Sequence, residues 1–244
     1  MKNNLVIKNI YSELCEELAT MKFSKPVAEV YNPLIYASDG VEKYLSYAEG
    51  VKRVIFLGMN PGPYGMAQTG VPFGEVGAVK NFLGINEIKI TLPEIKDSPF
   101  KISGLDCPRS EVSGKRLWGL FKERFGTAEN FFRENFVLNY CPLLFLERSG
   151  ENRARNLTPD KLKKSEREKL FAACNFSLKK IIEVLRPKFV AGIGNFAADR
   201  AKEALAGTNI TITKILHPSP ASPQSNKNWG EKVTEQLKIS GIWE

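Results

Sequence analysis

The chain has 244 residues, of which 43% are hydrophobic and 25% charged, a balance that is ordinary for a soluble globular protein. It contains no run of about 18 apolar residues and no signal-peptide core, which excludes a membrane-spanning helix and favours a soluble, intracellular protein. Its 35 Lys and Arg outnumber its 27 Asp and Glu, so the formal net charge is +8 and a polyanionic partner is favoured.

Hydrophobic periodicity predicts helices and strands that alternate along the chain. Apolar residues at helical spacing indicate an amphipathic helix over 10–20, and a short helix is expected over 39–48 with Asp39 as its cap. Short apolar runs predict buried strands at 54–57, 188–194 and 210–216, and another within 136–145 that carries Asn139 near its end and is stopped by Pro142. Further helices are expected at 77–83, from 117 to about 125, at 165–185 and at 229–239. This order predicts an α/β fold whose largely parallel sheet carries helices on both faces.

Three segments are expected to be irregular. Residues 30–34 should be extended, because residues before a proline avoid the α region. Residues 84–115 mix charge, Pro and Gly without periodicity, which predicts a long, loop-rich insertion. Residues 147–167 are strongly polar and should form a solvated face, with a helical turn after Thr158 and Pro159.

The four cysteines, Cys15, Cys107, Cys141 and Cys174, are scattered and form no C-x-x-C pair. Their spacing gives no support for an iron–sulfur cluster. Cys141 and Cys174 lie in apolar surroundings and should behave as small buried hydrophobes. We therefore predict no metal, no other cofactor and no disulfide.

The most informative stretch follows the strand expected at 54–57. It reads G-M-N-P-G-P-Y-G over residues 58–65 and continues to a second Gly- and Pro-flanked turn that contains Phe73. In an α/β sheet the loop after a strand is where ligands bind, and its Gly and Pro residues allow close approach and rigid turns. Neither common phosphate-binding motif is present. A plain strand–helix turn is the alternative to a ligand site at Asn60.

Other polar side chains also fall where expected strands end. Asn139 lies near the end of its strand, Asn195 follows the strand at 188–194, and His217, the only histidine, follows the strand at 210–216. Because parallel strands end at one edge of their sheet, these residues should lie near Asn60. A purely structural role is the alternative for each, and for Asn195 it is the one we expect. A buried Asn is costly unless its donor and acceptor are both used.

Three long motifs in chain order resemble those of the single-strand-selective monofunctional uracil-DNA glycosylases, within the uracil-DNA glycosylase superfamily. They are G-M-N-P-G-P-Y-G-M-A-Q-T-G-V-P-F-G-E at 58–75, F-V-x-N-x-C-P-L at 136–143 and H-P-S-P-x-x-P-Q-x-N-K-x-W at 217–229. The stretch E-V-S-G-K-R-L-W-G-L-F at 111–121 is also similar. The resemblance implies one domain over 1–244, a three-layer α/β/α sandwich around a mostly parallel four-stranded sheet.

The resemblance also implies a reaction: uracil, and oxidised derivatives such as 5-hydroxymethyluracil, would be excised from single- and double-stranded DNA. The target base must first leave the stack. Phe73 would then stack on it and Asn139 would read its polar edge. The backbone around Gly62 and Met66 would line its C5 side and help to exclude thymine.

Two residues would carry the chemistry by the same resemblance. His217 would donate a hydrogen bond to O2 and stabilise the charge of the departing uracil anion. Asn60 stands where other superfamily members have an aspartate. Since an amide takes no proton at neutral pH, Asn60 would orient the attacking water. The motifs contain no lysine for a Schiff base, which agrees with a monofunctional enzyme.

DNA contacts are expected from two segments. The stretch 109–116 places three cations beside hydroxyl groups, which suits backbone phosphates, although a solvated loop is the alternative. The residues chosen there are Ser113, Lys115 and Arg116. The loop after His217 would wedge into the duplex, and the residues chosen there are Pro218, Ser219, Pro220, Ala221 and Lys227. Ala221 stands where better-known relatives have a bulky basic residue, a departure that bears on the strength of the wedge.

We expect a monomer located with the DNA, in a bacterial cytoplasm or a eukaryotic nucleus. Two alternative functions remain. One is a superfamily relative that acts on deaminated purines, hypoxanthine or xanthine. The other is a non-catalytic α/β protein that binds nucleic acid or nucleotides.

Overall fold

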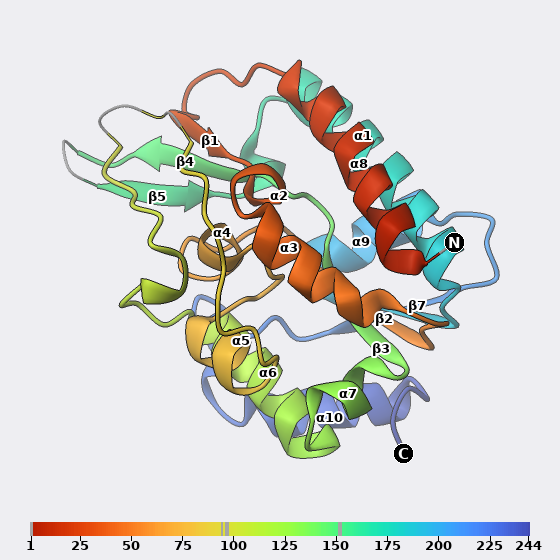
Figure 1. Ribbon diagram of the computed structural model, residues 1–244. Coiled ribbons are helices and arrows are strands. Elements are labelled where there is room, and N and C mark those ends of the chain that lie inside the picture. The colour runs from red at the N-terminus through yellow and green to blue at the C-terminus, as the bar shows by residue number, and fades with distance from the viewer. Residues whose placement is uncertain (1, 94, 96–97, 151–152) are drawn as a thin grey trace.

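A computed structural model describes residues 2–93, 95, 98–150 and 153–244 (Figure 1). Its centre is a four-stranded parallel sheet in the order β3-β2-β6-β7. These strands are β2 (Val54–Gly58), β3 (Asn135–Asn139), β6 (Phe189–Ile193) and β7 (Thr211–Ile215). Every residue of β2 and β6 is buried, which explains their unbroken apolar sequences. The predicted parallel sheet is confirmed.

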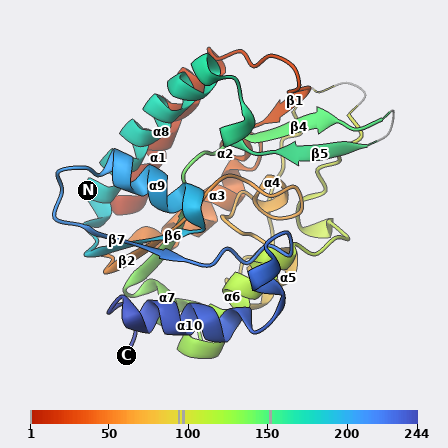
Figure 2. The same ribbon diagram turned by 180° about the vertical axis from the view of Figure 1, so that it is seen from behind.

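Helices cover both faces of this sheet, as predicted. On one side lie α1 (Asn3–Ala19), α8 (Lys164–Leu185) and α9 (Asn195–Ala204) (Figures 1 and 2). On the other side lie α6 (Val112–Phe125), α7 (Ala128–Phe132) and α10 (Trp229–Ile239). One buried apolar cluster extends from α1 through the sheet to α10. The carboxyl edge of the sheet is therefore held between two helical layers.

A second, three-stranded antiparallel sheet was not predicted. Its order is β1-β4-β5, formed by β1 (Glu29–Tyr31), β4 (Leu144–Arg148) and β5 (Ala154–Leu157). The strand expected to end near Asn139 is confirmed as β3, but the second strand after Pro142 was not expected. The chain leaves the main sheet after Asn139, passes Pro142, which has no N–H for a ladder, and joins the other sheet as β4.

Two local predictions before β2 need correction. The extended stretch ends at Asn32, because Pro33 starts α2 (Pro33–Tyr36) and the Asn32 side chain accepts a hydrogen bond of 3.1 Å from the Leu34 N–H. Asp39 does not cap α3 (Ser38–Leu45), since the helix begins before it. Its carboxylate instead accepts hydrogen bonds from Lys43 Nζ at 2.9 Å and the Lys89 N–H at 2.8 Å.

The segment between β2 and α6 carries α4 (Met66–Thr69), α5 (Val76–Asn81) and the expected insertion. Among the described residues of 84–111, the one regular element is a 3-10 helix, Gly104–Asp106, so the loop-rich prediction is confirmed there. Residues 94, 96 and 97 lie outside the described residues, as do residues 151 and 152 of the polar stretch 147–167. That stretch contains the end of β4, β5 and, as expected, a helical turn at Pro159–Lys161.

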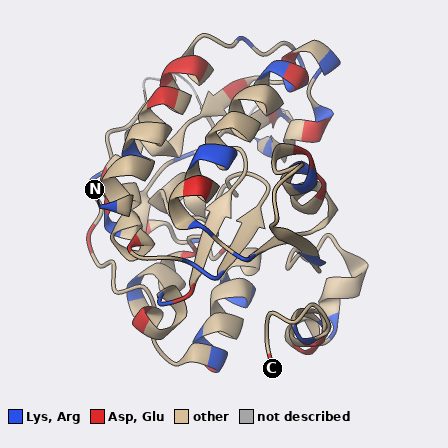
Figure 3. Ribbon diagram, turned by 90° about the vertical axis from the view of Figure 1, so that its right-hand side faces the viewer, with Lys and Arg blue, Asp and Glu red and all other residues tan. Residues whose placement is uncertain are grey.

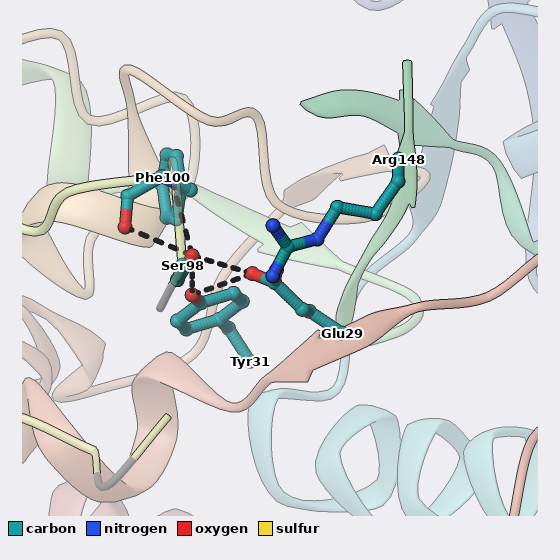
Figure 4. Close-up of polar contacts among 5 residues, drawn as sticks. All are labelled: Glu29, Tyr31, Ser98, Phe100 and Arg148. Carbon is teal, nitrogen blue, oxygen red and sulfur yellow. Dashed lines mark hydrogen bonds and ion pairs between the residues drawn. The ribbon is translucent and has the colours of Figure 1, made fainter. Parts of the chain in front are cut away.

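A partly buried polar cluster around Glu29 fastens the insertion to the second sheet (Figure 4). The hydroxyl groups of Ser98 and Tyr31 lie 2.5 and 2.9 Å from Glu29 Oε2, and Arg148 Nη2 lies 2.8 Å from Glu29 Oε1. The Phe100 ring packs edge-on against Tyr31 at 5.1 Å between centroids. A segment without regular structure is thus held against the second sheet at Ser98 and Phe100.

Candidate active site

Three loops at the carboxyl edge of the main sheet converge on one cavity of about 350 Å³. Asn60 comes from the loop after β2, Asn139 ends β3 and His217 follows β7. The predicted site residues that line the cavity are Asn60, Gly62, Phe73, Ser113, Asn139, His217 and Ser219. Asn195, the fourth polar residue at a strand end, does not line it and is the first residue of α9.

Gly58 allows two of these side chains to meet at the floor of the cavity. It pairs in register with Asn139 at the ends of β2 and β3. A Cβ atom on Gly58 would lie 2.5 Å from Phe73 Cε2 and closer still to Asn139 Oδ1. Because no real Cβ is found so close to another heavy atom, only glycine lets both side chains occupy these positions.

The Phe73 backbone is held in an unusual conformation. Its φ of 53° lies in the left-handed region, which bulky residues rarely adopt. The Phe73 carbonyl accepts hydrogen bonds from Trp118 Nε1 at 3.1 Å and from the Glu75 N–H at 2.7 Å. Strained residues of this kind cluster at binding sites, because the surrounding structure must hold them in place.

Asn139 has one amide atom satisfied weakly and the other not at all. Its Nδ2 donates to the Met66 sulfur at 3.2 Å, a poor acceptor. Its Oδ1 is buried and has no hydrogen-bond partner among the described residues. An unmade buried hydrogen bond costs about 1–3 kcal/mol, so this atom is suited to a ligand that brings a donor. Met66 lies against Asn139 and does not line the cavity.

His217 is held as a neutral donor. The Ser219 N–H donates to His217 Nδ1 at 3.0 Å, which places the proton of the neutral ring on Nε2. Burial lowers the pKa of His217 from 6.5 to about 4, so the ring stays neutral at physiological pH. Its centroid lies 6.2 Å from that of Phe73.

Asn60 is oriented by its backbone surroundings. Its Nδ2 donates to the Leu143 carbonyl at 3.2 Å, in the chain that links β3 to β4. With the amide nitrogen used in this way, Oδ1 is the atom that can accept a hydrogen bond from a water molecule in the cavity.

Comparison with known proteins agrees with this arrangement. The family model described as uracil DNA glycosylase superfamily matches residues 46–238. The chain belongs to this superfamily. The single-strand selective monofunctional uracil-DNA glycosylase of Rattus norvegicus is 46% identical over 230 residues, covering 93% of this chain and 81% of the relative. The corresponding protein of Bos taurus is 45% identical over 233 residues, covering 94% and 84%.

A solved structure shows the same fold. The crystal structure of wild-type Pedobacter heparinus SMUG2 covers 99% of both chains with a TM-score of 0.69 and 15% identity. At that identity the likeness concerns the fold alone. It supports the predicted uracil-DNA glycosylase-like α/β architecture.

The loop after β7 is fixed at its base and exposed at its tip. Arg116 Nη1 donates to the Pro218 carbonyl at 2.8 Å, so Arg116 ties α6 to this loop, a role that sequence reasoning missed. Ser225 Oγ donates to the His217 carbonyl at 2.5 Å. The predicted wedge residues Pro220, Ala221 and Lys227 are exposed and do not line the cavity. Lys115 on α6 is also exposed and does not line the cavity.

Five residues of the cavity wall were not predicted: Met59, Pro63, Glu111, Asn156 and Thr158. Asn156 and Thr158 come from β5 and the residue after it, so they reach the cavity only through the unpredicted sheet. Glu111 begins the stretch 111–121, which resembles the family, and this resemblance was a signal in the sequence that could have identified it as a site residue. Burial, and then repulsion from Glu75, raise its pKa from 4.5 to about 7.

The cysteines lie apart from this cavity. Cys141 and Cys174 are buried, as predicted, and all four thiols are free. Burial, and then the neighbouring Cys141, raise the pKa of Cys174. Within the described ranges no group of three or more His, Cys, Asp or Glu side chains could hold a metal ion, and no helix there is long and apolar enough to cross a membrane.

Proposed function

We propose that the protein is a monofunctional DNA glycosylase that excises uracil, and oxidised uracil derivatives such as 5-hydroxymethyluracil, from DNA. The observation that carries this proposal is the unpartnered Asn139 Oδ1 in a cavity that also holds an aromatic ring and a neutral imidazole. A base inside a duplex cannot reach such a cavity, so the target nucleotide is flipped out of the stack.

Base selection follows from the Asn139 amide. Its Oδ1 can accept from uracil N3–H while its Nδ2 turns from the Met66 sulfur to donate to O4. Cytosine presents a donor and an acceptor in the reverse order, so it would leave both amide atoms unpaired. Sites built to hydrogen-bond a substrate reject analogues that lack the matching group most strongly. Phe73 would stack on the ring of the bound base.

Bond cleavage uses the two oriented groups. As the N1–C1′ bond breaks, negative charge develops on the uracil, and the Nε2–H of His217 donates to O2, where that charge is greatest. Asn60 Oδ1 holds the water that attacks C1′ of the oxocarbenium-like sugar. The products are free uracil and an abasic site.

Binding to DNA would use the exposed part of the loop after β7 as the wedge, with Lys115 on a phosphate. The net charge of +8 supplies affinity independent of sequence. On the side seen in Figure 3, basic and acidic residues are interspersed over the helices. We propose that a monomer acts on both single- and double-stranded DNA, wherever the cell keeps its DNA.

The test uses a labelled oligonucleotide with one uracil, single-stranded or opposite guanine, incubated in EDTA and then cleaved with alkali at abasic sites. The wild type should cleave both substrates. Asn60→Ala should lower the rate roughly 10²- to 10⁴-fold with DNA binding retained. Asn86→Ala, an exposed position away from the cavity, is the matched control and should behave as wild type.

The same assay separates the alternatives. Tight DNA binding without uracil excision would refute the proposal. Excision of hypoxanthine or xanthine would then indicate a purine-directed glycosylase, and no excision of any base would indicate a binding protein.

A further inference from the structure

Glu111 occupies a space that three glycines create. It precedes α6, and its carboxyl group reaches the loop after β2. A Cβ on Gly62 would overlap Glu111 Oε1, and a Cβ on Gly65 would overlap Oε2. A Cβ on Gly114, in the first turn of α6, would lie 3.0 Å from Oε2. The glycines of the first motif therefore make room for this carboxyl group beside the cavity.

No structural role accounts for the carboxyl group. Oε2 is buried and has no hydrogen-bond partner within the described ranges, and the side chain does not cap α6. Glu75 gives the contrast: its Oε2 accepts from the Ala78 N–H at 2.8 Å and its Oε1 accepts from Ser110 Oγ at 2.7 Å. A carboxylate oxygen that is buried without a partner is costly, which points to a contact that the bound substrate completes.

The position of Glu111 follows from the other walls of the cavity. In the proposed complex Asn139 takes N3–H and O4 of the base and His217 takes O2. The ring edge left over is the one that carries C5, next to O4 on the side away from N3. Several lining residues have no assigned contact with the base, and among them Gly62, Pro63 and Glu111 form the part of the wall that belongs to the loop after β2 and the start of α6. We assign the C5 edge to this part of the wall.

We propose that Glu111 is a specificity-determining residue of this pocket, whose carboxyl group contacts the substituent that a damaged uracil carries at C5. This inference rests on the proposed function and names the residue that selects among its substrates at C5. Uracil has only a hydrogen at C5, which leaves room for a water molecule beside the carboxyl group, whereas thymine's methyl group fills that space and offers no hydrogen bond.

The protonation state of Glu111 decides which C5 substituents can form a hydrogen bond with its carboxyl group. Desolvation, then Glu75, raise its pKa to about 7, so the group changes from donor to acceptor near neutral pH. Across the cavity His217 is neutral, and the glycines of the β2 loop bring no charge. Arg109, from the preceding loop, stacks on the Tyr64 ring at 4.7 Å. A hydroxymethyl group donates and accepts, so it suits both forms, whereas a formyl group only accepts and needs the protonated form.

The experiment compares wild type with Glu111→Gln, whose amide always donates and keeps the same shape. Values of kcat/KM are measured from pH 6 to pH 8 on oligonucleotides with uracil, 5-hydroxymethyluracil or 5-formyluracil. For wild type, the ratio of formyluracil to uracil should fall about tenfold between pH 6 and pH 8, since about a tenth of a group with pKa 7 stays protonated at pH 8. For Glu111→Gln the tenfold fall that titration of Glu111 causes should be missing, so the ratio of formyluracil to uracil should fall about ten times less than in wild type.

The variants separate the possible failures. Ionisation of the substrate itself is common to both proteins, so the difference between their pH courses isolates Glu111. Glu123→Gln, at an exposed position in α6, is the matched control and should follow wild type. Identical pH courses for wild type and Glu111→Gln, with uracil excised by both, would overturn this inference alone. Failure of the wild type to excise uracil would instead overturn the proposed function.

Discussion

Gly58→Ala should damage the base pocket from beneath while leaving the rest of the fold intact. The added Cβ would lie 2.5 Å from Phe73 Cε2, 2.9 Å from Phe73 Cζ and closer still to Asn139 Oδ1. The β2 backbone is fixed by its ladders to β3 and β6, so the two side chains must move. Both are groups to which we assign base binding.

The size of the effect follows from what is displaced. Loss of aromatic stacking on the base is worth about 1–3 kcal/mol. Misplacement of the Asn139 amide is worth about 1–3 kcal/mol. Together they correspond to a fall in kcat/KM of roughly 30-fold to 10⁴-fold. Overpacking should also lower the free energy of unfolding by about 1–3 kcal/mol.

The assay measures single-turnover excision of uracil, together with urea unfolding. The matched control is Gly119→Ala in α6, where a Cβ meets nothing within 4 Å. That variant should keep full activity and gain about 0.5–1 kcal/mol of stability from better helix propensity. Wild-type kcat/KM for Gly58→Ala would show that Phe73 and Asn139 do not bind the base as we propose.

Three further predictions concern His217, Phe73 and Lys115. Because the folded-state pKa of His217, about 4, lies below its ordinary 6.5, the unfolded chain binds the proton more readily. Wild type should therefore lose about 1–3 kcal/mol relative to His217→Gln as the pH falls from about 6.5 to about 4, with a constant difference above that window; parallel urea-unfolding curves across this range would contradict it. At Phe73 the φ of 53° favours glycine, so Phe73→Gly should be more stable to urea than Phe73→Ala by about 0.5–1 kcal/mol. Both variants should lose excision equally, and a more stable alanine variant would argue against backbone strain there. Lys115→Ala should reduce the slope of log K for DNA against log salt by about 1 in a binding titration. Lys8→Ala on α1 should leave that slope unchanged, and equal slopes for the two variants would remove Lys115 from the DNA contacts.

Local sequence determined the main sheet and much of the site. The continuous apolar runs of β2 and β6 require burial on both faces, which a parallel sheet between helices provides. Once the sheet is parallel, the polar residues that follow its strands must share one edge. That argument predicts Asn60, Asn139, Asn195 and His217 at one edge, and the structure brings all of them except Asn195 to one cavity.

Tertiary structure decided what depends on contacts between distant segments. The pairing of 29–31 with 144–148 and 154–157 is non-local and too short to leave a periodic signal, so Asn156 and Thr158 could not be predicted. Arg116 reads in the sequence as a phosphate ligand, but the fold brings the Pro218 carbonyl to it. Glu111 Oε2 is buried without a partner at a position that exists only where the fold brings Gly62, Gly65 and Gly114 against the carboxyl group. Burial and hydrogen-bond satisfaction are properties of the packed chain, and periodicity along the sequence does not encode them.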